Sequence, residues 1–451
     1  MSTANATNPN PSILIVGGGP AGLALAAHLL TKGWSSVKVL ERRDRASLLA
    51  DTNSFYDMAS SGIQALLRVA DGAAAPGIFD QAVAFRKTAF YTKGGSGQPE
   101  FTTEWKDRSL GMPMFNVSRA VMLKALCEAV EALDVNCIQY NTNVISVDHT
   151  TGEVQVEGSD QPLKANLIVA ADGIHSKIRK QIFGDSGLRS DGIIACYATL
   201  PPLTEEEQKT FPNPSGVGSA YCTMGLRADL IESTAVNKEA TIWYANFLVD
   251  GKPHTVVPPK PDRKDGWLGE VRHRCEDGIP VLKALLDRTN EDQIQVVMCN
   301  DRPPLSTYHL GKVVLVGDSA HPFTPFAGLG SSQAIVDAFV LGEALLGCAT
   351  TEQAVDKFEK QRLMAANALM EESRAICSTD LSSRVFFWVL ERMVFPVAKR
   401  LGKIDELLNY VINDSATLVN NLVPFKIKEE EAAYQSRYDK AKSSLEAQLG
   451  M

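Results

Sequence analysis

The sequence lacks the features that mark several common classes of protein. Its eight cysteines are scattered and none forms a C-x-x-C pair, which argues against a zinc ribbon or a dithiol redox motif, and no metal site is predicted. So few thiols in 451 residues also give no disulfide framework, and we expect free thiols in a reducing cytoplasm. Acidic residues outnumber basic ones, 53 to 45, which argues against nucleic acid or an anionic membrane as a partner.

The sequence also lacks a convincing membrane span or a signal peptide. The apolar run at residues 13–30 is long enough to cross a bilayer, but it contains Gly17, Gly18, Gly19, Pro20 and Gly22 and fits a strand, turn and helix better. Residues 385–398 are apolar and aromatic, yet too short and too charged to span. Core packing, a protomer contact and an interfacial membrane helix all remain open for that segment. Residues 1–11 are predicted to be a disordered tail.

The remaining pattern indicates an α/β protein of more than one domain. Short buried strands are predicted near residues 12–16, 37–40, 165–170 and 313–316, separated by helical stretches. These predict a Rossmann-like, discontinuous domain made from residues 12–190 and 300–365. Residues 191–299 contain strand-like pieces and loops rich in proline, glycine and charge, which predicts an inserted mixed β-sheet domain. Residues 366–451 are predicted to be C-terminal helices.

A glycine-rich turn at the first strand predicts a dinucleotide site. Gly17-x-Gly19-x-x-Gly22 follows that strand and opens a helix, the arrangement in which backbone N–H groups meet a pyrophosphate. Glu41 lies nineteen residues after Gly22, near the spacing at which a carboxylate binds a ribose 2′-hydroxyl. An acidic residue there disfavours a 2′-phosphate, so the bound adenosine is predicted to belong to FAD or NAD rather than NADP.

Two later segments distinguish FAD from NAD. Asp172-Gly173 follows the buried strand at 165–170, and Gly317-Asp318 follows the strand at 313–316 and runs into Gly328-Leu329-Gly330. With the glycine-rich turn, these segments resemble the three motifs of the group A, single-component FAD-dependent aromatic monooxygenases, a family that includes p-hydroxybenzoate hydroxylase, salicylate hydroxylase and the tetracycline-inactivating monooxygenase. The resemblance covers about residues 12–365. It implies an FAD-binding domain with an inserted substrate-binding sheet.

The resemblance assigns expected roles to individual residues. Asp318 is expected to bind a ribityl hydroxyl, and Gly328 and Gly330 to open a helix that faces the isoalloxazine. Arg119 is expected on the flavin side of FAD, and Asp57 beside it. Asp172 is either a contact for FAD and NAD(P)H or a helix cap with Ser176 and Arg179. Arg42 and Arg45 lie either near phosphates or NAD(P)H, or on a solvated loop.

The implied chemistry belongs mainly to the cofactor. NADPH or NADH is expected to reduce FAD, and O2 to form a C4a-hydroperoxide that hydroxylates or epoxidises an aromatic or polycyclic small molecule. Such a site must exclude water. Phe323, Pro325 and Phe326 are the expected flavin-side lining. Tyr221, Tyr244 and Phe247 are candidates for the opposite wall, although ordinary sheet packing is the better interpretation for each of them singly. No acid–base residue is assigned, and His321 is interpreted as structural. The enzyme is expected to be a monomer or homodimer.

Other functions share this fold. A flavin-dependent halogenase needs a tryptophan-rich signature, whereas the five tryptophans here are far apart in the sequence. A non-catalytic escort protein with the FAD fold, which would not hold flavin, is an alternative. An FAD-dependent dehydrogenase or an epoxidase differs in substrate and is not separated by these motifs.

Overall fold

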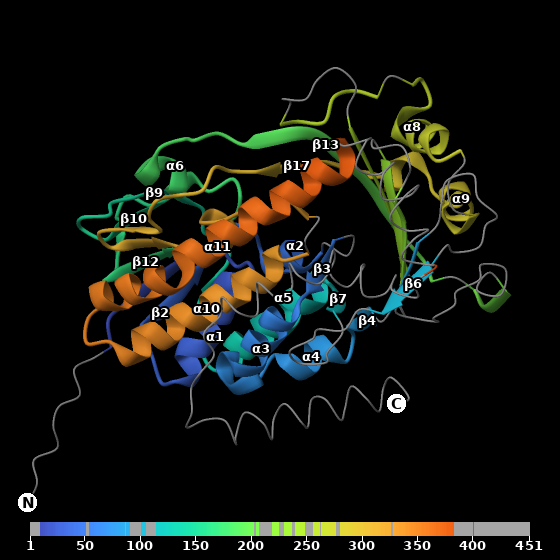
Figure 1. The fold of residues 1–451 in the computed structure, drawn as a ribbon. Coiled ribbons are helices and arrows are strands. Elements are labelled where there is room, and N and C mark those ends of the chain that lie inside the picture. Colours follow the sequence, from blue (N-terminus) through green and yellow to red (C-terminus); the bar gives the residue numbers. More distant parts are fainter. Residues whose placement is uncertain are drawn as a thin grey trace, which may run out of the picture.

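The computed structural model describes residues 10–50, 54–85, 87–90, 101–104, 114–202, 204–206, 219–224, 230–236, 240–248, 256–261, 263–276, 280–325, 328–382 and 400. Two sheets lie at opposite ends of an elongated molecule (Figure 1). Two long strands, β13 (Arg189–Leu200) and β17 (Gln295–Asp301), lead from one end to the other, and helix α11 (Thr351–Ser382) runs alongside them. The α/β fold class predicted from the sequence is confirmed.

The first sheet is the Rossmann-like core. Its strands have the order β18-β19-β12-β1-β2-β8, and all neighbours are parallel except β18 and β19. The bounds are β1 Ile13–Val16, β2 Val37–Leu40, β8 Ile138–Gln139, β12 Leu167–Ala170, β18 His309–Leu310 and β19 Val313–Leu315. The central strands are buried along their whole length, because a parallel sheet is covered on both faces.

Helix α1 (Pro20–Thr31) shows why the run at residues 13–30 is so apolar. It is buried on nearly every side, since it packs against both α10 (Gly330–Gly347) and α5 (Arg119–Glu131). A helix that is apolar all round belongs inside a core, and alanine and glycine let its neighbours approach. Within the described residues, no helix is both long enough and apolar enough to cross a membrane.

Smaller elements complete this part of the chain. The strands β3 (Phe55–Met58), β7 (Met114–Ser118) and β4 (Val83–Phe85) form one antiparallel sheet, and β9 (Val144–Val147), β10 (Glu153–Val156) and β11 (Leu163–Lys164) form another. The helices here are α2 Arg45–Leu49, α3 Ser60–Arg68, α4 Ala75–Phe79 and α6 Lys177–Phe183, with 3-10 turns at Val69–Gly72 and Gly317–Ser319.

The second sheet is mixed, as predicted, with the order β17-β13-β16-β15-β14-β5-β6. Its other strands are β5 Lys87–Phe90, β6 Phe101–Glu104, β14 Ser219–Met224, β15 Leu230–Val236 and β16 Thr241–Leu248. It therefore draws β5 and β6 from the range 12–190 that the sequence pattern gave to the FAD-binding domain. The long-range parallel pairing of β5 with β14 leaves no trace in local periodicity.

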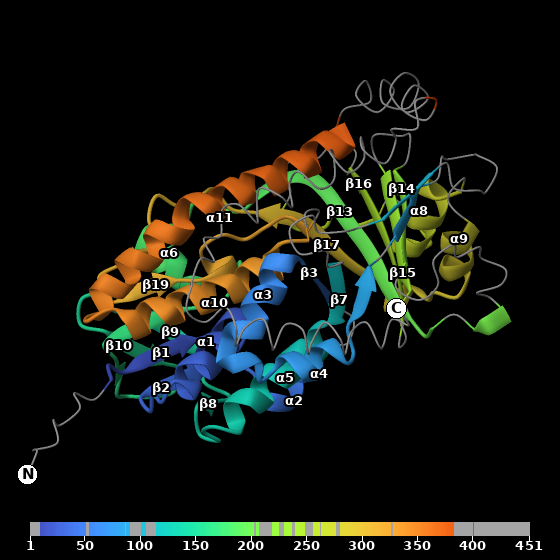
Figure 2. The same cartoon turned by 60° about the horizontal axis from the view of Figure 1, so that its bottom comes forward.

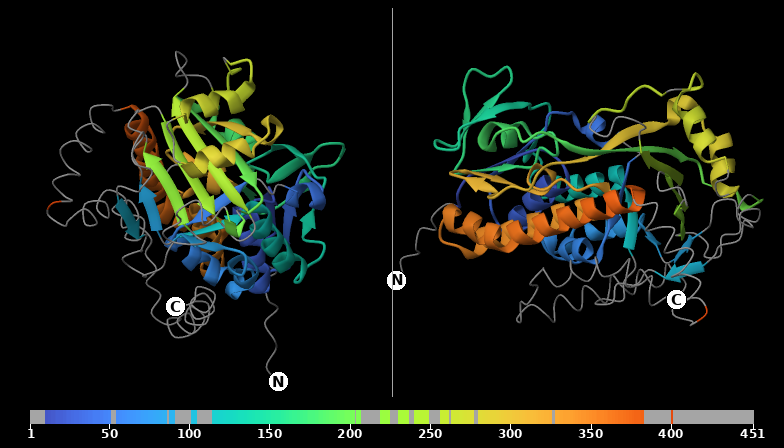
Figure 3. Two further views of the ribbon diagram at one scale, coloured as in Figure 1. Left: turned by 90° about the vertical axis from the view of Figure 1, so that its right-hand side faces the viewer. Right: turned by 45° about the horizontal axis from the view of Figure 1, so that its top comes forward.

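Two helices cover the outer face of this sheet, α8 (Gly266–Arg274) and α9 (Pro280–Asp287), with the 3-10 turn Glu291–Gln293 beside them. Figures 2 and 3 show these helices packed on the strands. The core between these helices and the sheet contains Trp243, Phe247 and Leu282. The opposite face of the second sheet therefore faces the first sheet.

An ion cluster joins α11 to the two long strands. Asp301 of β17 is fully buried and binds Arg189 of β13 and, at 2.9 Å, Arg374 of α11. Of the predicted C-terminal helices, α11 continues to Ser382, whereas residues 385–398 and most of the predicted tail 1–11 lie outside the described residues. The six cysteines whose side chains are described are free thiols, as predicted.

Candidate active site

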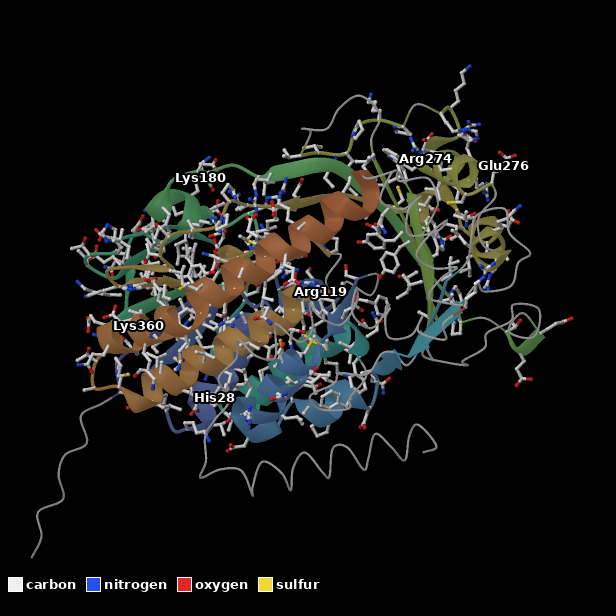
Figure 4. The ribbon with its side chains drawn as sticks, viewed as in Figure 1. His28, Arg119, Lys180, Arg274, Glu276 and Lys360 are labelled. Carbon is white, nitrogen blue, oxygen red and sulfur yellow. The ribbon has the colours of Figure 1, made fainter. Side chains whose placement is uncertain are left out.

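A cavity of about 880 Å³ lies between the two sheets. It opens at the carboxyl ends of β1, β2, β12 and β19, where open parallel sheets bind ligands, and extends to the inner face of the second sheet. Figure 4 shows Arg119, which lines it, near the centre of the molecule, while Lys180 and Lys360 lie at the periphery. The predicted residues that line it are Gly17, Gly19, Glu41, Arg42, Asp57, Arg119, Asp172, Asp318, Gly328, Gly330, Tyr244, Phe323 and Pro325.

The glycine-rich turn has the shape of a phosphate cradle. Gly17 has a φ of +112°, and a β-carbon there would collide with the carbonyl oxygen of Ala171. A β-carbon at Gly22 would collide with the backbone of Gly17, so Gly22 is a packing position and does not line the cavity. Gly19 faces open space and precedes α1 without a side-chain cap. The open space and the uncapped backbone N–H groups fit the pyrophosphate of FAD.

Glu41 is held at the end of β2 by three donors. Its Oε2 accepts from the backbone N–H of Gly18 at 2.8 Å, and its Oε1 accepts from the backbone N–H and the Nε of Arg43 at 2.9 and 3.0 Å. Burial favours the neutral form, but these hydrogen bonds outweigh it and lower the pKa of Glu41. Glu41 therefore presents a fixed carboxylate, the acceptor that a ribose hydroxyl requires.

Asp172 binds the first turn of α6 and also lines the cavity, while its contact with FAD and NAD(P)H stays a prediction. Its Oδ2 accepts from the backbone N–H of Lys177 at 3.0 Å, while Ser176 caps α6 by accepting from the N–H of Arg179 at 2.8 Å. Its Oδ1 is buried without a partner among the described residues, and burial raises the pKa of Asp172. An unsatisfied buried oxygen at the cavity wall fits a ligand donor there.

Arg179 links two of the motifs and is not a ligand group. It is 1% exposed and donates to the carbonyl oxygens of Ala320 and Pro303, both at 2.7 Å. Desolvation lowers the pKa of Arg179 to about 10. Its guanidinium fixes the loop after β19 against the start of α6.

Asp318 lies in that loop and is exposed within the cavity. No described residue donates a hydrogen bond to its carboxylate, and desolvation by the surrounding protein raises the pKa of Asp318. A β-carbon at Gly330 would lie 3.9 Å from Asp318 Oδ1, which places this carboxylate beside the N-terminus of α10. The predicted ribityl acceptor and the predicted flavin-facing helix end therefore adjoin each other.

A fully buried network of hydrogen bonds and ion pairs supports the same loop from outside the cavity. Asp337 of α10 accepts from the N–H of Gly317 at 2.8 Å, from His321 Nε2 at 2.6 Å and from Arg362 Nε at 2.6 Å. The His321 and Arg362 charges outweigh desolvation and lower the pKa of Asp337 to about 2. His321 is completely buried and does not line the cavity, which agrees with its interpretation as a structural residue.

The charged groups in the central part of the cavity are Asp57 and Arg119. Asp57 Oδ1 accepts from Asn116 Nδ2 at 2.9 Å, and Arg119 Nε donates to the hydroxyl of Tyr56 at 3.1 Å. At the other end, Arg42 lines the cavity and is exposed, whereas Arg45 binds Glu131 and does not line it. Asp57 and Arg119 thus lie where the first and second sheets face each other.

The predicted aromatic wall needs one correction. Tyr244 lines the cavity, but Phe247 is buried on the other face of β16. Its ring packs at a tilt against Trp267, and the guanidinium of Arg274 lies above it at 4.4 Å. Residues an odd number apart on a strand point to opposite faces, so Tyr244 and Phe247 cannot share a wall. Phe326 and the side chain of Tyr221 lie outside the described residues.

Among the lining residues that were not predicted, three are important for the central part of the cavity. Tyr197 of β13 pairs in register with Tyr244, and their ring centroids are 5.6 Å apart. Asn246 follows Tyr244 by two residues on the same face, and Tyr56 holds Arg119. Strand alternation could have identified Asn246, whereas Tyr197 depended on a pairing register that the sequence does not reveal.

Comparison with known proteins agrees with this geometry. The family model described as "FAD binding domain" matches residues 11–190 and 288–373, more than half of the chain. The 3-amino-4-hydroxybenzoate 2-monooxygenase PtmB3 of Streptomyces platensis is 26% identical over 82% of this chain and 88% of its own. The phenazine 1,6-dicarboxylic acid hydroxylase PhzS of Lysobacter antibioticus is 26% identical over 83% of this chain and 91% of its own.

The solved structure of Klebsiella pneumoniae HpxO with FAD and uric acid has the same fold. Its TM-score is 0.73 at 18% identity, with 92% of this chain and 97% of that chain covered. The relatives are oxygenating enzymes, which fits the catalytic interpretation and not the escort protein. The chain belongs to the FAD-binding-domain family and is an FAD-dependent monooxygenase of group A.

Proposed function

We propose that this enzyme uses NADH or NADPH and O2 to hydroxylate or epoxidise an aromatic or polycyclic small molecule. One oxygen atom enters the substrate and the other leaves as water, with two electrons supplied by the nicotinamide. The observation that carries the proposal is the single cavity that runs from the glycine-rich turn to a wall containing Tyr197 and Tyr244. The names of the relatives, which refer to an aminohydroxybenzoate and a phenazine dicarboxylic acid, support the aromatic class.

The chain's own residues would hold the cofactor along this cavity. Gly17, Gly19 and Glu41 suit the adenosine and pyrophosphate half, and Asp318 suits the ribityl chain. The N-terminus of α10, an 18-residue helix, suits the pyrimidine edge because its partial positive charge stabilises negative charge on the ring. When bound, FAD carries electrons from the nicotinamide to O2 and supplies the oxygenating chemistry.

The protein must also exclude water from the reaction site. Phe323 and Pro325 lie on one side of the cavity, and Tyr197 and Tyr244 on the other. Apolar and aromatic side chains exclude the water that would divert reduced oxygen to hydrogen peroxide. The sequence contains no second G-x-G-x-x-G, which favours transient docking of the nicotinamide over a dedicated domain.

The test is turnover of the purified holoenzyme. NADH and NADPH are compared as reductants of the flavin under anaerobic conditions. Under air, oxidation of the better reductant is then followed with a panel of aromatic compounds. We expect at least one compound to accelerate oxidation and to yield a product with one additional oxygen atom by mass spectrometry. Oxidation that no aromatic compound accelerates, with all electrons recovered as hydrogen peroxide, would contradict the proposal.

A further inference from the structure

We propose that Asp57 binds the O–H or N–H group of an uncharged hydroxyarene or aminoarene and, where that group is a hydroxyl, accepts its proton. The inference rests on the proposed function, because it assumes an aromatic substrate. It assigns Asp57 to the substrate, whereas the sequence predicted a contact with FAD.

Asp57 is held between the N-terminal end of α10 and the wall of the second sheet. It lies on β3 opposite Asn116 of β7, and its backbone oxygen accepts from Ser331 Oγ at 2.8 Å. Ser331 is in the first turn of α10, the helix end proposed to face the flavin. On the other side, Asp57 is close enough to Tyr244 to disfavour ionisation of that phenol. The carboxylate therefore lies between the flavin-facing helix end and the wall of the second sheet.

The partners of Asp57 leave one oxygen available. Oδ1 accepts from Asn116 Nδ2 at 2.9 Å, while Oδ2 has no hydrogen-bond partner within the described part of the chain. This partner is a neutral amide, and no cation in the described part of the chain forms an ion pair that would hold Asp57 in its ionised form. A half-buried carboxylate of this kind gains most from a ligand that donates a hydrogen bond to it.

In the described part of the second sheet, the opposite wall carries no charge that would favour an anionic ligand. Among the described residues, the strands of the second sheet contribute Ala195, Tyr197, Tyr244, Asn246 and Val297 to the cavity, and all are uncharged. A substrate carboxylate placed at this wall would face Asp57 without a cation from the sheet. Arg119 is a cation in this part of the cavity, and its Nε donates to the hydroxyl of Tyr56. Between Asp57 and the uncharged wall, a neutral donor group is favoured.

Proton transfer from the substrate to Asp57 is reversible. With a hydroxyarene, the substrate O–H bond breaks, a bond from that hydrogen to Asp57 Oδ2 forms, and the electron pair stays on the substrate oxygen. The added electron density activates the ring toward an electrophilic oxygen, and the proton later returns to the product. Asn116 Nδ2 holds the other oxygen, Oδ1, and leaves Oδ2 available for the proton.

The pH dependence follows from the groups that surround Asp57. The titratable groups on the facing elements are Tyr56, Arg119, Tyr197, Tyr244 and Asp318. Desolvation raises the pKa of Tyr244 far above its ordinary range, so this phenol stays protonated. Desolvation also raises the pKa of Asp57, and activity is therefore lost as the pH falls through that raised pKa.

The experiment compares wild-type holoenzyme with Asp57→Asn and Asp57→Glu. Resorcinol and aniline serve as neutral probes and benzoate as the anionic probe, and the flavin difference spectrum reports binding. We expect the wild type to bind the two neutral probes in preference to benzoate.

Asp57→Asn should bind the neutral probes at least about 10-fold more weakly than the wild type. At neutral pH it should hydroxylate resorcinol about 10²- to 10⁴-fold more slowly, the range typical of a lost general base. Its rate should recover at high pH, where resorcinol ionises by itself. Asp57→Glu should keep the acidic limb of the pH profile.

The outcomes separate the inference from the proposed function. Equal affinity and rate in Asp57→Asn, a wild-type preference for benzoate, or no binding of either neutral probe would overturn the role of Asp57. Loss of FAD from Asp57→Asn would also overturn it, in favour of a cofactor contact. Failure of the wild type to be reduced by NADH or NADPH would instead contradict the proposed function.

Discussion

The Nε2 atom of His321 lies 2.6 Å from Oδ2 of Asp337, and both side chains are completely buried. The same carboxylate binds the backbone N–H of Gly317 and the guanidinium of Arg362. One buried anion in α10 thereby fixes both ends of the loop that presents Asp318 to the cavity. The shape of the cofactor site depends on a residue that never touches the cavity.

Replacing Asp337 by Asn should therefore destabilise the protein strongly. The change leaves the buried Arg362 guanidinium without its carboxylate, and breaking such a pair costs about 3–5 kcal/mol. Urea unfolding of the holoenzyme measures the change. Asp356→Asn on α11 is the control, since its pair with His309 is exposed at the surface and should contribute less than about 1 kcal/mol. Equal stability of the two variants would contradict the role of the network.

The same pair predicts how stability depends on pH. The pKa of Asp337 is lowered from 3.8 to about 2, so its contribution to stability is present above the unfolded value and is lost as the pH falls from about 4 toward 2. The wild type should lose stability in this window by a larger amount than Asp337→Asn. Thermal unfolding at a series of acidic pH values tests this, and parallel curves for the two proteins would refute it.

Asp318→Ala should weaken FAD binding. Loss of a charge-assisted hydrogen bond of about 1.5–3 kcal/mol corresponds to roughly 10- to 150-fold in the dissociation constant. Flavin content after dialysis and titration with FAD measure the change. Asp292→Ala removes an exposed carboxylate outside the cavity and should retain wild-type affinity. Full FAD occupancy in Asp318→Ala would count against this placement of the ribityl chain.

Substitutions of Tyr244 and Phe247 should affect different properties, activity and stability respectively, although the two residues are only three positions apart. Phe247→Ala opens a hole between the second sheet and α8 and should cost about 3–5 kcal/mol of stability. Tyr244→Phe keeps the packing and alters the cavity surface, so it should change substrate KM or the coupling of NAD(P)H oxidation to product with little change in Tm. The reverse pattern would show that the faces of β16 are misassigned.

The parts of this molecule that follow from local sequence were predictable. Continuous apolar runs predicted β1, β12 and β19, and the spacing of Gly17, Gly19 and Gly22 predicted the turn, because both reflect forces that act within a few residues. Their convergence on one cavity followed from the rule that parallel strands bind ligands at their carboxyl ends.

The features that depend on long-range pairing were not predictable. Tyr197 reaches the cavity through its register with Tyr244, and β5 joins the second sheet through β14, more than a hundred residues further along the chain. The role of Asp337 was hidden for a similar reason, since its partners come from a loop and from α11 and meet it only in the folded chain. Strand alternation alone would have separated Tyr244 from Phe247.

The most direct test is to purify the protein and measure its flavin content together with the oxygen incorporated into an aromatic substrate from labelled O2. We expect a yellow protein with one FAD per chain, whose NAD(P)H oxidation yields a product that carries a single labelled oxygen atom. A colourless protein that takes up no added FAD, or a product whose oxygen comes from water, would contradict the conclusion that this cavity binds flavin for monooxygenation.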